Sequence, residues 1–195
     1  MSRSPGDVYN PAGIMLVNLR ALLGVIIDIV LLRRGPDSLP ASPALLAIVV
    51  GVYAAVMGLV ASWFATPEQH WPLELGAGIA LVLLWYRVAL TLAGKRERFV
   101  QMMTALFSAH LLIRPLTVPM QSTLLAQAQT PSASPSSGLA LIFLILLVWL
   151  FVITVRVVRS TFEWPTAGAI ILVLAQELTM ITIIVLLLSG SVPAT

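Results

Sequence analysis

The chain has 195 residues, of which 59% are hydrophobic and only 10% are charged. A soluble domain carries about 25% charged residues, so this composition, with a mean hydropathy of +1.00, excludes a soluble enzyme and predicts an integral membrane protein. The net charge of +3 is too small to indicate a nucleic-acid partner. The chain has no cysteine, and its two histidines are forty residues apart. Disulfides and thiolate metal sites are therefore excluded, and no metal or cofactor is expected.

The first predicted element is a helix over residues 12–32. Its Arg20, Gly24 and Asp28 recur every four residues and form one polar stripe on an otherwise apolar surface. This pattern is typical of an amphipathic helix that lies in the cytoplasmic membrane interface or packs along the bundle. A spanning orientation is the alternative, because 21 residues are long enough to cross a bilayer.

Five longer apolar segments follow a proline-rich connector, and Ser42 and Pro43 suit the N-cap and first residue of the first of them. The sequence thus predicts an all-α, polytopic transmembrane helical bundle with five spans plus the N-terminal amphipathic helix. We expect a cytoplasmic lead over 1–42, the bundle over 43–190 and a tail over 189–195. The predicted spans cover residues 43–64, 72–94, 99–119, 138–158 and 166–188.

Basic residues alternate between the connections, which indicates how the chain threads through the membrane. By the positive-inside rule, the N-terminus is expected in the cytoplasm and the C-terminus outside, in a bacterial cytoplasmic (inner) membrane. Anionic lipid headgroups on the cytoplasmic side are the expected partners of the basic residues. These lipid-facing residues are Arg33, Arg34, Lys95, Arg96 and Arg98, and Arg156 and Arg159 flank the last basic turn.

The third span carries unusual residues for a membrane helix: His110, Arg114, Pro115 and Pro119. A charge in hydrocarbon is expensive, and each proline removes a backbone hydrogen bond that lipid cannot replace. The two prolines are therefore predicted to break the helix. We expect the other spans to wrap around this one.

Depth suggests partners for these residues. His110 and Glu177 each lie eleven residues from the cytoplasmic start of their spans, or about 16 Å at about 1.5 Å per residue. Glu177, next to Gln176, is therefore predicted to pair with Arg114 or His110. In one interpretation the cluster lines a polar cavity that handles a proton, an ion or an anionic substrate. In the other, which the small number of groups favours, a neutral pair fixes helix register and the prolines set a kink.

Catalytic motifs are absent from the sequence. It contains no phosphate-binding glycine loop, no GxSxG elbow and no zinc motif. Ser108 and His110 lie two residues apart on a predicted helix and would face different directions. An enzyme, even an intramembrane one, is therefore not expected.

The layout of an amphipathic helix, a connector (Leu31-Leu32-Arg33-Arg34-Gly35-Pro36 through Leu39-Pro40-Ala41-Ser42-Pro43) and five closely spaced spans resembles the bacterial members of the Yip-type five-span membrane family. These are relatives of eukaryotic Rab-interacting Golgi proteins, whose long cytosolic N-terminal region has no counterpart in this sequence. The resemblance implies a non-enzymatic scaffold or assembly/trafficking-type factor that acts through lipids, a membrane-protein partner or self-association. The alternative is a small transporter or channel subunit that uses His110, Arg114 and Glu177.

Overall fold

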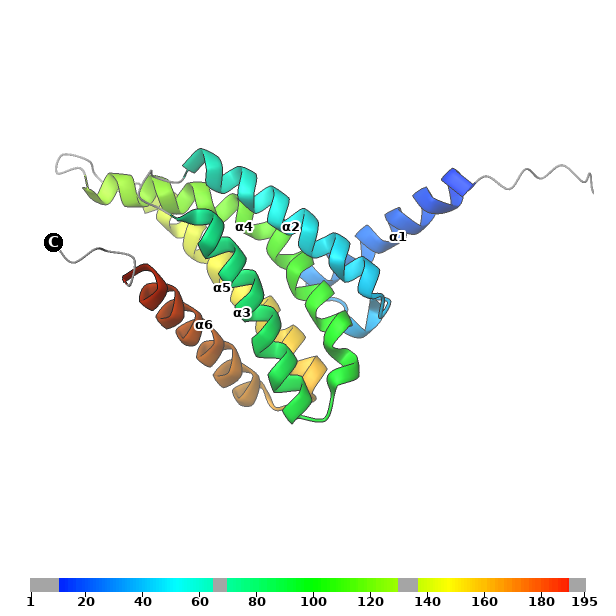
Figure 1. Ribbon diagram of the computed structural model, residues 1–195. Helices are drawn as coiled ribbons and strands as arrows, with labels where there is room; N and C mark the ends of the chain where they lie inside the picture. Colours follow the sequence, from blue (N-terminus) through cyan, green and yellow to red (C-terminus); the bar gives the residue numbers. More distant parts are fainter. Residues whose placement is uncertain (1–10, 65–69, 130–136, 190–195) are drawn as a thin grey trace, which may run out of the picture.

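The computed structural model describes residues 11–64, 70–129 and 137–189, and every regular element in these ranges is helical (Figure 1). Five helices are long and apolar enough to cross a membrane, which confirms the predicted all-α polytopic bundle. Residues 1–10 of the predicted lead and residues 190–195 of the predicted tail lie outside the described residues. The elements are α1 (Pro11–Val30), η1 (Pro36–Ser38), α2 (Pro43–Phe64), α3 (Trp71–Leu92), η2 (Arg96–Arg98), α4 (Phe99–Gln129), α5 (Ser137–Phe162) and α6 (Thr166–Ser189).

Helix α4 is the centre of the bundle, as the sequence predicts for the third span. Half of its most apolar stretch is buried, against 11–22% for the other four spanning helices. It packs against α1, α2, α3 and α5, whereas α6 packs on α5 and α3. Small side chains bring the neighbours close, since Ala105 and Ala109 are fully buried. The remaining helices therefore turn their outer faces to lipid.

The predicted helix break at Pro115 and Pro119 is wrong. Helix α4 is continuous over 31 residues and contains both prolines. The two prolines remove the backbone donors of the Leu111 and Pro115 carbonyls. Hydroxyl groups of the same stretch bond to other carbonyls: Thr117 Oγ1 donates to the Arg114 carbonyl at 3.1 Å, and Ser122 Oγ donates to the Pro119 carbonyl at 2.9 Å. Proline is tolerated inside a membrane helix that other helices surround, and α4 packs against four of them. The prolines bend α4 instead, and its ribbon changes direction in its second half (Figure 1).

Helix α1 is fastened to the bundle by its C-terminal end. Ile26 and Ile29 are buried there, and the indole N–H of Trp149 on α5 donates to the Val30 carbonyl at 3.2 Å. Asp28 of the polar stripe has a partner within the protein, because it forms an ion pair with Arg34 at 3.0 Å. The first part of α1 projects away from the bundle (Figure 1). Its expected place in the membrane interface stays a prediction.

The connector and the start of α2 also fit the bundle closely. Ser42 Oγ accepts a hydrogen bond from the Leu45 backbone N–H at 3.3 Å, which makes Ser42 the N-cap ahead of Pro43, as predicted. Leu39 is buried, and its carbonyl accepts a bond from Gln101 Nε2 at 2.7 Å. The connector is therefore held on α4.

Two turns are joined at one end of the bundle, which we call the basic end and define by the α3–α4 turn (93–98) and the α5–α6 turn (163–165). Glu163 forms ion pairs with Lys95 and, at 2.7 Å, with Arg98. The two cations also donate to carbonyls in the last turn of α5, Lys95 to Phe162 at 3.0 Å and Arg98 to Thr161 at 3.1 Å. Cations at a helix C-terminus are stabilising.

This arrangement refines the prediction of lipid-facing basic residues. Lys95 and Arg98 are used inside the protein, and Arg34 pairs with Asp28. Arg33 and Arg96 are exposed, and no ion pair involves them among the described residues. The predicted role in binding anionic headgroups therefore rests mainly on these two.

The centre of α4 offers a test of the packing. Ala109→Leu inserts a larger side chain at a fully buried position, and we expect it to destabilise the protein by about 1–3 kcal/mol through overpacking. The measurement is thermal unfolding of the purified protein in detergent. Ala128→Leu is the matched control, because Ala128 is exposed on the same helix. Equal melting temperatures for the two variants would contradict the central position of α4.

The joined turns predict a pH dependence. Hydrogen bonds from Lys95 and from Arg98, with the attraction of both charges, lower the pKa of Glu163 below its ordinary value of 4.5. A lowered pKa gives stability that is present above pH 4.5 and is lost as the pH falls through the folded-state value. Glu163→Gln should therefore lower the melting temperature at pH 7 and match the wild type at low pH. Glu97→Gln, at an exposed residue of the same end, should leave the pH profile unchanged.

Candidate functional site

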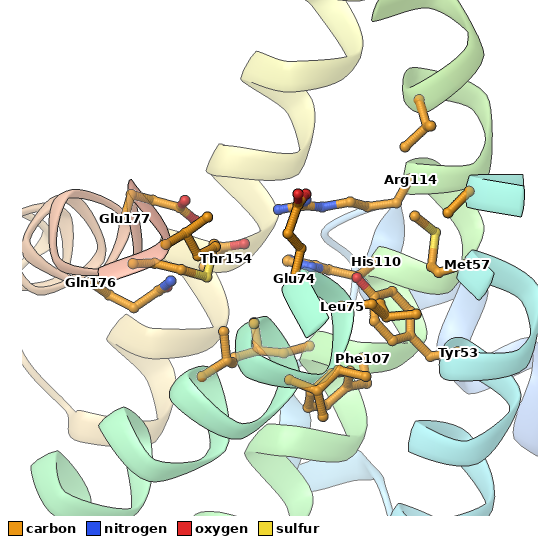
Figure 2. A pocket seen from close by; sticks show the side chains of 18 of the residues that line it. Tyr53, Met57, Glu74, Leu75, Phe107, His110, Arg114, Thr154, Gln176 and Glu177 are labelled. Carbon is orange, nitrogen blue, oxygen red and sulfur yellow. The ribbon is translucent and has the colours of Figure 1, made fainter. Parts of the chain in front are cut away.

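Side chains from all five spanning helices surround a cavity of 260 Å³ inside the bundle, which we call the central cavity. His110 and Arg114 point into it from α4, and Gln176 and Glu177 reach it from α6 (Figure 2). The polar or aromatic residues that line it are Tyr53, Trp71, Glu74, Tyr86, Phe107, His110, Arg114, Thr154, Gln176 and Glu177. The structure thus brings together the four members of the predicted polar cluster.

Helix geometry explains why these residues meet. His110 and Arg114 are four residues apart, so they lie on one face of α4 one turn from each other. Gln176 and Glu177 lie near the middle of α6, at the predicted matching depth. Because α6 packs on α3 and α5, it faces α4 across the cavity. Glu177 and His110, which are predicted to lie at a common depth, thus line the same cavity.

The predicted direct pair of Glu177 with Arg114 or His110 is wrong. Ion pairs among the described residues join Asp28 to Arg34 and Glu163 to Lys95 and Arg98, and they leave out the charged groups of the cavity. Arg114 and Glu177 approach the same space from opposite walls, and Glu74 enters it from α3 (Figure 2). The central cavity lies between Arg114 and Glu177. The two charged groups therefore do not form an ion pair, although they were predicted to lie close together.

The hydrogen bonds of the cavity walls are incomplete. Tyr86, which is fully buried, donates its hydroxyl to Gln176 Oε1 at 3.3 Å and so links α3 to α6. The Nε2 atom of His110 is buried and has no hydrogen-bond partner among the described residues. A buried polar atom without a partner costs free energy. His110 therefore marks a place where water or a ligand can bind.

A second cavity, of 360 Å³, lies between α4, α5 and α6 and shares four residues with the first. We call it the lateral cavity. His110, Arg114, Thr154 and Glu177 line both. These four residues therefore form the partition between the two cavities, and a molecule passing from one to the other would meet them.

Sequence reasoning missed several residues of the site. Glu74 supplies a second carboxylate, Tyr86 holds Gln176, and Tyr53 and Thr154 complete the wall. The available signal was Glu74, the one acidic residue within the predicted second span. Because Glu74 lies only one turn inside the predicted span, its part in the site was not recognised from the sequence. Tyr53, Tyr86 and Thr154 look like ordinary core or interface residues, and only the packing of the helices reveals them.

No protein-family model matches the chain, and no curated protein or solved structure is significantly similar to it. The chemistry of the site therefore rests on its own geometry. Within the described ranges, no three His, Asp or Glu side chains come together as a metal site would require. The groups present, two carboxylates, a guanidinium and an imidazole, can hold a polar or charged molecule.

Cysteine labelling tests whether the central cavity holds water, because the chain has no native cysteine. Gly78 lines the cavity, and a Cβ added there meets no atom within 4 Å. Gly78→Cys should react with a charged, water-soluble thiol reagent. Gly51→Cys is the matched control, since Gly51 is exposed on the apolar surface of α2 with the same free space. It should stay unlabelled, because a charged reagent does not enter hydrocarbon. Equal labelling of both variants would contradict a hydrated cavity.

Proposed function

We propose that this integral membrane protein is a small transporter or channel subunit that binds a polar or charged solute in its central cavity. One observation carries the proposal: Glu74, Arg114 and Glu177 reach one cavity from three helices, and none of them is in an ion pair within the described part of the chain. Unpaired charges within a membrane bundle cost free energy unless water or a ligand meets them.

The same observation weakens the interpretation of the cluster as a structural pair. A pair that fixes helix register should be in direct contact, because only a close partner offsets the desolvation of a buried charge. Arg114 and Glu177 instead face the cavity from separate helices. His110, with its unpartnered Nε2, adds a polar atom that a purely structural cluster would not leave unsatisfied.

The cavity is closed toward one end of the bundle. Between it and the basic end lie Leu90, Met102, Met103 and Phe162, which are almost completely buried. At the other end its walls include Ala61 and Trp71, where α2 ends and α3 begins. If the basic end faces the cytoplasm of a bacterium, as the positive-inside rule predicts, the cavity is reached from outside. This orientation is part of the proposal.

A thermal-shift screen tests solute binding. A ligand that binds the folded protein raises its melting temperature by mass action. We expect at least one class among inorganic cations, organic cations, anions and neutral solutes to stabilise the wild type. Glu177→Gln should abolish the shift, and the control Glu97→Gln, at an exposed residue of the basic end, should keep it. If no class shifts the wild type, the proposal is contradicted.

The second candidate is the scaffold or assembly factor implied by the Yip-type resemblance. One observation favours it: a groove of 460 Å³ between α3 and α6 is almost entirely apolar, and the buried indole N–H of Trp85 beside it has no acceptor among the described residues. A membrane helix of a partner, or of a second copy, could cover this groove. Co-purification of a stoichiometric partner in mild detergent, without any thermal shift by solutes, would favour this candidate.

A further inference from the structure

The charges and aromatic walls of the central cavity point to one class of ligand. We propose that the cavity binds a hydrophobic organic cation with a single positive charge, and that Glu177 holds this charge. The inference rests on the proposed function, because it names the solute that the cavity takes. It depends on the charge balance of the site, on the composition of its walls and on the lateral cavity beside it.

The charge balance comes first. Glu74 and Glu177 contribute two negative charges and Arg114 one positive charge, while neutral His110 contributes none, so the lining carries one net negative charge. In a medium of low dielectric constant an uncompensated charge is unfavourable. A ligand with one positive charge neutralises the cavity, whereas an anion would double the imbalance. The unpartnered Nε2 of His110 fits the same ligand, because a neutral imidazole can accept a hydrogen bond from an ammonium N–H.

The walls favour an organic cation over an inorganic one. Tyr53, Trp71, Tyr86 and Phe107 line the cavity, and the rings of Tyr53 and Phe107 meet edge to face with centroids 5.3 Å apart. Aromatic faces attract cations and also pack against apolar groups. The volume of 260 Å³ far exceeds the roughly 30 Å³ of one water molecule. A bare metal ion would leave most of this space to be filled.

The lateral cavity shows how such a molecule could arrive. Apart from Thr154, its α5 wall is apolar, with Leu147, Val148, Leu150 and Phe151. Leu147 and Val148 are 40% and 53% exposed on the lipid-facing surface. A hydrophobic cation dissolved in the bilayer can therefore enter between α4, α5 and α6. It then meets the partition residues, among them Glu177, without first crossing water.

Three probes of similar size separate the possibilities: phenethylammonium, 2-phenylethanol and phenylacetate, which are cationic, neutral and anionic. Binding to the full-length protein in phosphatidylcholine nanodiscs is measured by calorimetry, with empty nanodiscs as the blank. We expect phenethylammonium to bind at least about tenfold more tightly than the other two. Sodium and potassium chloride should not compete with it, because the aromatic walls select the organic group.

Two variants are expected to have different effects on binding. Glu177→Gln should weaken phenethylammonium binding by about tenfold or more, whereas Arg114→Gln should leave it unchanged or tighten it, because that variant makes the cavity more negative. Glu97→Gln is the control for the removal of a carboxylate elsewhere. Should a cavity variant fail to fold, the ranking of the three probes on the wild type decides by itself.

The outcomes distinguish this inference from the proposed function. Preference for phenylacetate, with binding lost in Arg114→Gln, would show an anion site; the proposed function would then stand and the inference would fail. Binding of sodium or potassium without phenethylammonium would also overturn it. If none of the probes binds and no solute class shifts the melting temperature, the proposed function fails as well.

Discussion

A guanidinium, an imidazole and two prolines share one apolar helix, and hydrocarbon can satisfy none of them. This constraint decides where α4 lies, because only other helices or enclosed water can serve as partners. Helix α4 is accordingly the most buried of the spanning helices. Its two prolines lie within one continuous helix, and His110 and Arg114 face a cavity lined by the neighbouring helices. The bundle is built around the polar groups of one helix.

The two ends of the molecule differ in a way that follows from the same constraint. At the basic end, Glu163 joins the α3–α4 turn to the α5–α6 turn, and fully buried residues such as Met102 and Leu90 fill the interior. Toward the other end α4 bends, and the central cavity lies between it and α6 (Figures 1 and 2). The basic end thus holds the helices together, whereas toward the opposite end the helices leave space for the central cavity. A bundle with one closed and one hollow end is suited to receiving a ligand from one side.

Most of the architecture could be predicted from hydropathy, because each spanning helix must be apolar over its own length and the signal is therefore local. The start of α2 at Pro43, with Ser42 as its cap, was equally readable. The effect of Pro115 and Pro119 was not, because the packing of neighbouring helices decides whether a proline breaks a helix or only bends it. Depth along the helices predicted that His110 and Glu177 lie near one another, and both line the central cavity, but depth could not give the distance across the bundle.

The sequence by itself determined that this chain crosses a membrane as a helical bundle, which residues are polar within it and how deep they lie, because composition and rise per residue settle these properties. Only the tertiary structure decided which groups meet. The packing of α6 on α3 and α5 brings Glu74 and Tyr86 to the cluster and separates Arg114 from Glu177 by a cavity. The physical reason is that lateral packing depends on the shapes of whole helix faces, whereas depth depends on position along one chain.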